Sequence, residues 1–213
     1  MLKKLTEAQQ TKLIETAILE FADKGLKGAG LSRIAKNAGV SVGVIYKYYE
    51  DKDALFDACV KRTLDYLNEA LQQVGASDAQ GADLPDLVRA LVNKVQTSCR
   101  EHPEYFRMYH QITAGNASKH GEKLAELIER PSAQAYKAAL TKAVEEGRID
   151  EELDPGAGAF FFDNLLMMLH YAYSCAYYQN RMDIYCGKQL AANEKKMEEQ
   201  MVRFILNGLG YKE

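Results

Sequence analysis

The chain has 213 residues, a net charge of −3 at pH 7 and four cysteines. Lys3 and Lys4 precede no apolar run typical of a signal peptide, and no segment holds about twenty apolar residues in succession. We therefore expect a soluble, cytoplasmic protein without a membrane partner. The four cysteines are Cys59, Cys99, Cys175 and Cys186. Because no C-x-x-C spacing occurs among them, the sequence favours reduced core thiols over a zinc site or a redox pair. A thiol sensor stays an alternative.

Charge is distributed unevenly along the sequence. Residues 1–52 contain nine of the 27 Lys and Arg and six of the 30 Asp and Glu, so this part carries about +3 and the remainder about −6. A basic N-terminal part beside an acidic remainder indicates that only the first part contacts phosphate. With no Trp, four Pro and a long helical periodicity of apolar residues, the chain is predicted to be nearly all helix.

Two helices are predicted in the first forty residues. An amphipathic helix covers residues 11–25 and stops at Gly25. A second helix covers residues 31–38, where apolar residues recur at the i, i+3, i+4 and i+7 positions. Gly39 follows directly, and a glycine at this place can adopt the left-handed conformation that a sharp turn needs.

A third short helix is predicted over residues 42–48. Ser41 is placed to cap it, because a serine oxygen can accept a free N–H of the first helical turn. Ile45 is expected in the core, with Val42, Gly43, Tyr46 and Lys47 facing outward. Gly43 lowers helix stability, so we expect the backbone there to approach a partner such as a phosphate or a base edge. Helix, glycine turn and basic aromatic helix together predict a helix-turn-helix.

The string I-A-x-x-A-G-V-S-x-G-x-x-Y-x-Y-[FY]-x-x-K-x-x-L over residues 34–55 resembles the DNA-binding signature of the TetR family of bacterial repressors. The likeness runs over residues 21–55. It implies that Tyr46, Tyr48 and Lys52 hold phosphates and that Val42, Gly43 and Lys47 lie over the major groove, where bases are distinguished.

Two positions depart from the family pattern. Gly30 stands where the family usually has a Thr that caps the helix and touches phosphate, so one backbone contact is in doubt. Arg33 replaces a common acidic residue and adds positive charge near the DNA. The predicted DNA-binding residues are therefore Arg33, Ser41, Val42, Gly43, Tyr46, Lys47, Tyr48 and Lys52.

Further helices are predicted downstream. Residues 52–73 form a long helix that could transmit a shift between the helix-turn-helix part, called the head below, and the remainder of the chain. A polar stretch over residues 75–83 follows. Proline placement predicts a helix over residues 104–114 and a kink or split at Pro131 within a helical run over residues 118–146.

The helix predicted over residues 155–179 is apolar on nearly every side. Such a helix must be covered on every side, so one face is expected to meet the subunit's own core and another a second copy of the chain. Together with a last helix over residues 193–209, it predicts a homodimer with a four-helix interface, as in TetR-like proteins. The two recognition helices would then have to lie about 34 to 36 Å apart to read a palindrome.

Aromatic and Met side chains of the helical part could line an apolar pocket for an aromatic or lipophilic effector, and ordinary core packing is the alternative. The candidates are Tyr66, Tyr105, Phe106, Tyr109, Phe162, Met168 and Tyr173. A polar stripe on the helix over residues 155–179 is placed either to fix the polar end of a ligand or to pair across a dimer, and it comprises Asp163, His170, Ser174 and Tyr177.

The sequence thus predicts an all-α protein with a three-helix helix-turn-helix DNA-binding domain in residues 1–51. Residues 52–213 would form a helical effector-binding and dimerisation domain. The predicted function is a DNA-binding transcriptional regulator, a repressor released from a palindromic operator by a small apolar or aromatic effector. The sequence shows no nucleophile–base pair, phosphate loop or metal spacing, so neither an enzyme nor a cofactor is expected. Two alternatives remain: a small-molecule-binding protein or enzyme with an incidental helix-turn-helix, and a regulator that recognises a partner protein.

Overall fold

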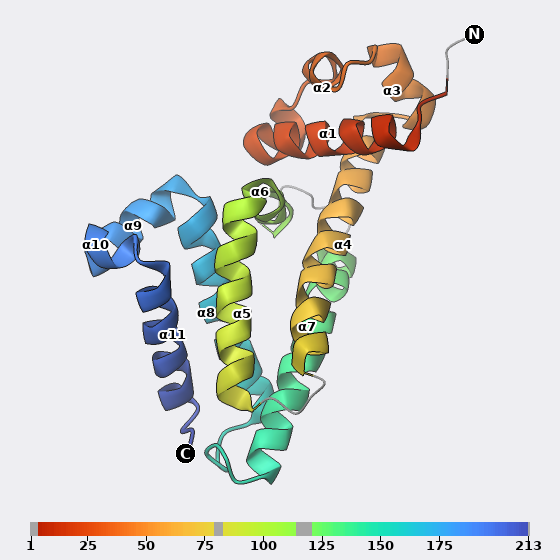
Figure 1. Cartoon of the computed structure of the whole chain (residues 1–213). Coiled ribbons are helices and arrows are strands. Elements are labelled where there is room, and N and C mark those ends of the chain that lie inside the picture. The colour runs from red at the N-terminus through yellow and green to blue at the C-terminus, as the bar shows by residue number, and fades with distance from the viewer. Residues whose placement is uncertain (1–3, 79–82, 114–120, 213) are drawn as a thin grey trace. The chain divides into compact units, whose positions relative to one another are not determined.

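The computed structural model describes residues 4–78, 83–113 and 121–212, which are helical almost throughout and contain no strand (Figure 1). The all-α prediction is confirmed. Contacts between residues divide the chain into two compact units. Unit 1 comprises Met1–Leu67 and Glu104–Lys123, and unit 2 comprises Asn68–Pro103 and Leu124–Glu213. The predicted functional boundary after residue 51 stays a prediction.

Unit 1 contains α1, α2, α3, the first part of α4, and α6, which are Glu7–Gly28, Leu31–Ala38, Val42–Tyr48, Lys52–Asp78 and Pro103–Gln111. Helices α2 and α3 have the predicted bounds. Helix α1 is longer than predicted at both ends. It begins earlier because Thr6 and Gln9 form a capping box, and it continues past Gly25 through a kink at φ 64°.

The core of unit 1 is built from large apolar side chains on its first four helices. Phe21, Ile34, Ile45 and Leu55 are fully buried. The Phe21 ring also meets Phe56 of α4 edge to face, with 5.1 Å between ring centroids. These contacts hold α1, α2 and α3 against the start of α4.

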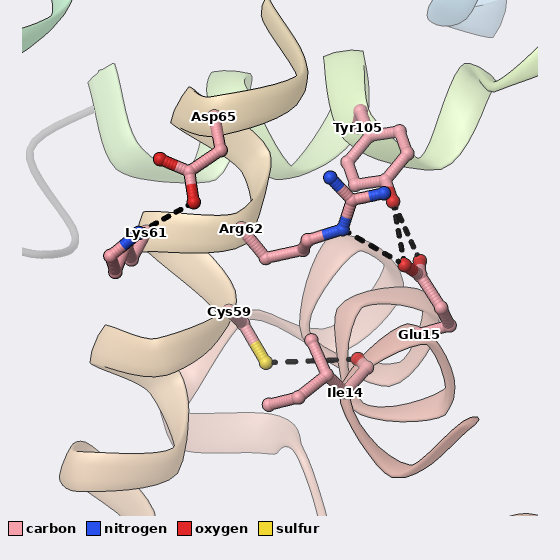
Figure 2. A network of polar contacts seen from close by, with 7 residues as sticks. All are labelled: Ile14, Glu15, Cys59, Lys61, Arg62, Asp65 and Tyr105. Carbon is pink, nitrogen blue, oxygen red and sulfur yellow. Dashed lines mark hydrogen bonds and ion pairs between the residues drawn. The ribbon is translucent and has the colours of Figure 1, made fainter. Parts of the chain in front are cut away.

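A carboxylate joins three helices of unit 1 (Figure 2). Glu15 on α1 accepts a hydrogen bond from Nε of Arg62 on α4 at 3.2 Å. The hydroxyl of Tyr105 on α6 lies 2.7 and 2.8 Å from the two oxygens of the same carboxylate. Burial and the hydrogen bond to Glu15 raise the pKa of Tyr105, so the hydroxyl stays protonated and donates. The ring of Tyr105 stacks on Tyr66 with 4.3 Å between centroids.

Two further contacts attach α6 to α1. Arg107 lies 3.6 Å from Asp23 in an ion pair, and the Gln111 side-chain amide donates to the carbonyl of Ala22 at 3.3 Å. Helix α6 therefore packs with the predicted DNA-binding head, although α5 separates the two in the sequence.

Unit 2 contains α5 at Leu84–Glu101, most of α7 at Gly121–Glu145, α8 at Pro155–Ser174, α9 at Ala176–Cys186, α10 at Lys188–Ala191 and α11 at Glu194–Gly208. Helix α5 packs against both α8 and α11 (Figure 1). The buried side-chain amide of Gln96 on α5 donates to the hydroxyl of Tyr173 at 3.0 Å and to the carbonyl of Glu194 at 2.9 Å. One amide thus ties α5 to α8 and to the start of α11.

Several predicted bounds were wrong. The helix predicted to end at residue 179 ends at Ser174, because Cys175 is extended at φ −127° and ψ 123° and α9 begins after it. Helix α7 continues through Pro131, so of the predicted kink or split only the split is wrong and the kink stays a prediction. Helix α4 continues to Asp78 instead of residue 73. Residues 79–82 of the predicted polar stretch lie outside the described residues. So do residue 114, the predicted end of one helix, and residues 118–120, the predicted start of the next.

The Glu15 contacts predict a measurable coupling between α1 and α6. Tyr105→Phe removes the donor but keeps the stacked ring, and Glu15→Gln removes the charge of the acceptor. A double-mutant cycle on the free energy of unfolding should give a coupling of about 1–2 kcal/mol. Either single substitution already weakens the hydrogen bond to the charged carboxylate, so the double mutant should lose less stability than the sum of the two single losses. Urea denaturation measures it. Strictly additive effects would show that the hydroxyl and carboxylate do not interact in solution.

Candidate nucleic-acid interface

The turn between α2 and α3 has the backbone geometry that the sequence predicted. Gly39 lies in the left-handed region at φ 76°, and its N–H bonds to the carbonyl of Lys36 at 3.2 Å. The N–H of Val40 bonds back to the carbonyl of Ala35 at 2.9 Å, which closes the end of α2. Ser41 then caps α3, its hydroxyl oxygen accepting the N–H of Val44 at 3.3 Å.

Helix α3 divides into a buried face and an outward face. Val44 and Ile45 are buried in unit 1. Tyr46 is 54% exposed, and Gly43 and Lys47 are also exposed. The residues that the sequence placed outward therefore lie outward, except that Val42 is half-buried.

Gly43 has no role in the packing of the described chain. A Cβ added there would meet only the Ser41 hydroxyl oxygen, at 3.8 Å. Neither a steric conflict nor a positive φ calls for glycine at this position, although an alanine would favour the helix. Because Gly43 has no side chain, nothing projects from the helix surface at this position in the exposed first turn of α3.

Arg33 is held in place by a carboxylate that the sequence analysis did not identify. Its Nε donates to Glu20 on α1 at 2.8 Å, while the Arg33 side chain stays 53% exposed. The same Glu20 oxygen accepts the N–H of Gly30 at 3.1 Å. Gly30 provides no side-chain cap for α2, so Glu20 supplies the acceptor at this helix start.

Two of the predicted phosphate-binding groups make intramolecular contacts. The Tyr48 hydroxyl accepts the N–H of Leu5 at 2.6 Å, which leaves its own proton to be donated elsewhere. The Lys52 ammonium donates to the carbonyls of Lys27 and Ala29 at 3.3 and 3.2 Å. Lys52 thus binds at the C-terminal end of α1, where Ala29 is the cap residue.

The predicted effector residues fall into the two units. In unit 1, Tyr66 and Tyr105 stack on each other, and Tyr105, Phe106 and Tyr109 are buried. In unit 2, Phe162 packs edge to face on Tyr136 with 4.9 Å between centroids. Tyr173 receives the Gln96 amide, and Met168 is 42% exposed. That these seven residues form one pocket stays a prediction.

The four cysteines do not form disulfides with one another. All four thiols are free, and burial raises the pKa of both Cys59 and Cys99. Within the described residues, no three His, Cys, Asp or Glu side chains group closely enough to hold a metal ion. In the same part of the chain, no helix is both long and apolar enough to cross a membrane.

The sequence of the head is similar to known regulatory proteins. Residues 13–59 match the family described as bacterial regulatory proteins, tetR family. The HTH-type transcriptional regulator BetI of Burkholderia thailandensis is 31% identical over 96 residues, which are 44% of this chain and 49% of that protein. The chain thus spans about half the length of this curated relative.

Solved structures with the same fold cover nearly the whole chain. The transcriptional regulator FadR from Bacillus subtilis, solved in complex with stearoyl-CoA, superimposes with a TM-score of 0.70 at 15% identity, over 93% of this chain and 98% of that one. AibR, solved with isovaleryl coenzyme A and operator DNA, superimposes with a TM-score of 0.65 at 19% identity, over 95% and 98% of the two chains. Residues 13–59 thus match the tetR family of bacterial regulatory proteins, and the described chain has the fold of these solved structures.

Proposed function

We propose that the chain is a DNA-binding transcriptional regulator whose α3 enters the major groove. The observation that carries this proposal is the outward face of α3, where Gly43, Tyr46 and Lys47 are exposed on a helix fixed by the Ser41 cap and the buried Ile45. Arg33 on α2, held by Glu20, adds a cation. Cations and hydroxyls position a protein on phosphates, and side chains in the major groove read base edges.

The finer proposal is a repressor that leaves a palindromic operator when a small apolar or aromatic effector binds the helical part. AibR, solved with both an acyl coenzyme A and operator DNA, and FadR, solved with stearoyl-CoA, support control by a small molecule. Release requires that the effector prefer the form that does not bind DNA. Helices α4 and α6 are suited to carry that preference to the head, since Arg62 and Tyr105 both bind Glu15 of α1.

The direct test is fluorescence anisotropy of the full chain with DNA from its own upstream region and with scrambled DNA, at two salt concentrations. We expect tight, salt-sensitive binding to the first DNA and much weaker binding to the second. Lys47→Ala should abolish the preference. Equal, weak binding of both DNAs, unchanged by Lys47→Ala, would contradict sequence-specific recognition of this DNA by α3.

Gly43→Ala should separate DNA binding from folding. A Cβ at this position has room in the free protein, and alanine favours a helix by up to about 1 kcal/mol, so the thermal midpoint should stay equal or rise. The same methyl group would hold the backbone of α3 away from DNA, and we expect the dissociation constant for the operator to rise at least about tenfold.

Gly208→Ala is the matched control, because a Cβ there meets nothing within 4 Å and the position lies at the end of α11. It should leave operator affinity within about twofold of the wild type. An unchanged affinity in Gly43→Ala would show that the backbone at Gly43 does not approach DNA.

We further propose that two chains associate through α8 and α11. The rings of Phe160 and Phe161 on α8 and of Phe204 on α11 are 64%, 63% and 65% exposed. Exposed aromatic rings on two helices that both pack against α5 are typical of a surface that another protein covers. A second copy is the occupant that a palindromic operator requires.

Light scattering at micromolar concentration should therefore give the mass of a dimer. Phe161→Asp should convert the protein to a monomer, since a carboxylate would be buried without a partner. Leu19→Asp, at another exposed apolar position on α1, is the control and should leave the dimer intact. A monomeric wild type would contradict this interface.

A further inference from the structure

The short segment before α1 is tied directly to α3, and α1 begins beside that helix (Figure 1). The N–H of Leu5 donates to the hydroxyl of Tyr48, the last residue of α3, at 2.6 Å. The two residues are 43 positions apart in the sequence, so this bond exists only because both belong to the packed unit 1. The family resemblance implied a phosphate contact for Tyr48 but none for residues 4–6.

The backbone of this segment is anchored at two successive residues. The carbonyl of Leu5 accepts the side-chain amide of Gln10 at 3.2 Å, and the Leu5 side chain is only 8% exposed. Thr6 exchanges two hydrogen bonds with Gln9, because its N–H donates to Oε1 of Gln9 at 3.0 Å and its Oγ1 accepts the Gln9 N–H at 3.3 Å. The backbone at residues 5 and 6 is therefore held at the end of α3.

Lys4 comes directly before this anchored backbone. Its side chain is exposed, and its ammonium makes no hydrogen bond or ion pair with any described residue. Consecutive Cα atoms lie about 3.8 Å apart, so the backbone of Lys4 starts one residue from the amide that binds Tyr48. The positive charge of Lys4 is thus carried on backbone whose position relative to α3 is fixed.

The Tyr48 hydroxyl still has a proton to donate. A phenolic hydroxyl can both accept and donate a hydrogen bond. Its oxygen accepts the N–H of Leu5, and no described residue accepts its proton. An accepted hydrogen bond holds the oxygen in place and strengthens the hydroxyl as a donor, because successive hydrogen bonds polarise one another. The half-buried Tyr48 side chain therefore presents an oriented donor at the end of α3.

An oriented hydroxyl and an ammonium on adjoining backbone suit the phosphates of DNA. Phosphate oxygens accept hydrogen bonds from Lys and Tyr side chains, and such contacts fix the orientation of a protein on the duplex. The outward residues Gly43 and Tyr46 lie earlier on α3. In the proposed complex, the end of α3 therefore lies nearer the strand that borders the groove.

We propose that the segment before α1 is an additional DNA-backbone contact of the head. Lys4 binds a phosphate of the duplex, and the amide of Leu5 positions the Tyr48 hydroxyl, which donates to a phosphate beside it. Lys4 is thus a binding residue, and Leu5 is a positioning residue that acts through Tyr48. This inference rests on the proposed function, because it requires the head to bind DNA.

Anisotropy of the full chain with the upstream DNA and with the scrambled DNA tests Lys4. Lys4→Ala should weaken binding of both DNAs by the same factor, about five- to tenfold, because phosphates are alike in every sequence. It should also lower the slope of log affinity against log salt by about one for each bound chain. Lys12→Ala is the matched control, since Lys12 is likewise exposed and makes no ion pair with a described residue. It should change either affinity less than about twofold.

A double-mutant cycle on the same affinities tests the Leu5–Tyr48 bond. Leu5→Pro removes the N–H, and Leu5→Ala keeps the N–H while losing the buried side chain. Leu5→Pro should weaken binding of both DNAs at least about threefold more than Leu5→Ala does. In Tyr48→Phe, which lacks the hydroxyl, the two Leu5 substitutions should have equal effects, a result that a merely structural role of Leu5 would not give.

NMR of protein labelled with ¹⁵N-leucine observes the same bond without DNA. The Leu5 amide resonance, assigned by its loss in Leu5→Ala, should move to higher field in Tyr48→Phe because the amide proton loses its acceptor. Addition of either DNA should shift it in the wild type. A Leu5 amide that Tyr48→Phe leaves unchanged would overturn the positioning role.

The two DNAs keep this inference separate from the proposed function. If the wild type prefers the upstream DNA and Lys4→Ala behaves like Lys12→Ala, only the Lys4 contact is contradicted. If the wild type binds both DNAs equally and Lys4→Ala weakens both, the contact is supported and only sequence-specific recognition is contradicted. A loss confined to the upstream DNA would also overturn a phosphate contact, and a chain that binds neither DNA would contradict both proposals.

Discussion

The attachment of α6 to α1 through the Glu15 carboxylate is the contact on which the organisation of this chain depends. Tyr105 and Arg62 bring α6 and α4 to the same acceptor, and the stacked ring of Tyr66 keeps the Tyr105 hydroxyl aimed at it. A hydrogen bond to a charged group contributes more than one between neutral groups. Unit 1 therefore contains a helix that follows α5 in the sequence, and the backbone passes between the two units three times, after residues 67, 103 and 123. The two units are thus joined covalently at three places.

The parts of the head that could be predicted are those encoded by neighbouring residues. The left-handed Gly39, the Ser41 cap and the buried Ile45 lie within seven positions of one another, and each has its own local signal. The partners of Tyr48 and Arg33 could not be predicted in this way. The Tyr48–Leu5 bond spans 43 residues and the Arg33–Glu20 bond spans 13, so both exist only after the helices have packed.

In unit 2, too, a helix end with a signal in neighbouring residues could be predicted, and one without such a signal could not. The predicted helix start at residue 155 is confirmed, where Asp154 caps α8 directly before a proline at its first position. The end of α8 at Cys175 has no glycine or proline to announce it. There the Ser174 hydroxyl donates to the carbonyl of His170 at 2.6 Å, a local competitor of the helical ladder that a sequence pattern does not reveal.

The Leu5–Tyr48 hydrogen bond has a consequence for how the protein is handled. The amide of Leu5 occupies an acceptor site on a hydroxyl at the end of α3, and Leu5 itself is buried. The backbone around Leu5 therefore helps to orient the Tyr48 hydroxyl, so an affinity tag joined at this end would add its mass close to α3. A purification scheme that places a tag there would alter the surface whose affinity it is meant to measure.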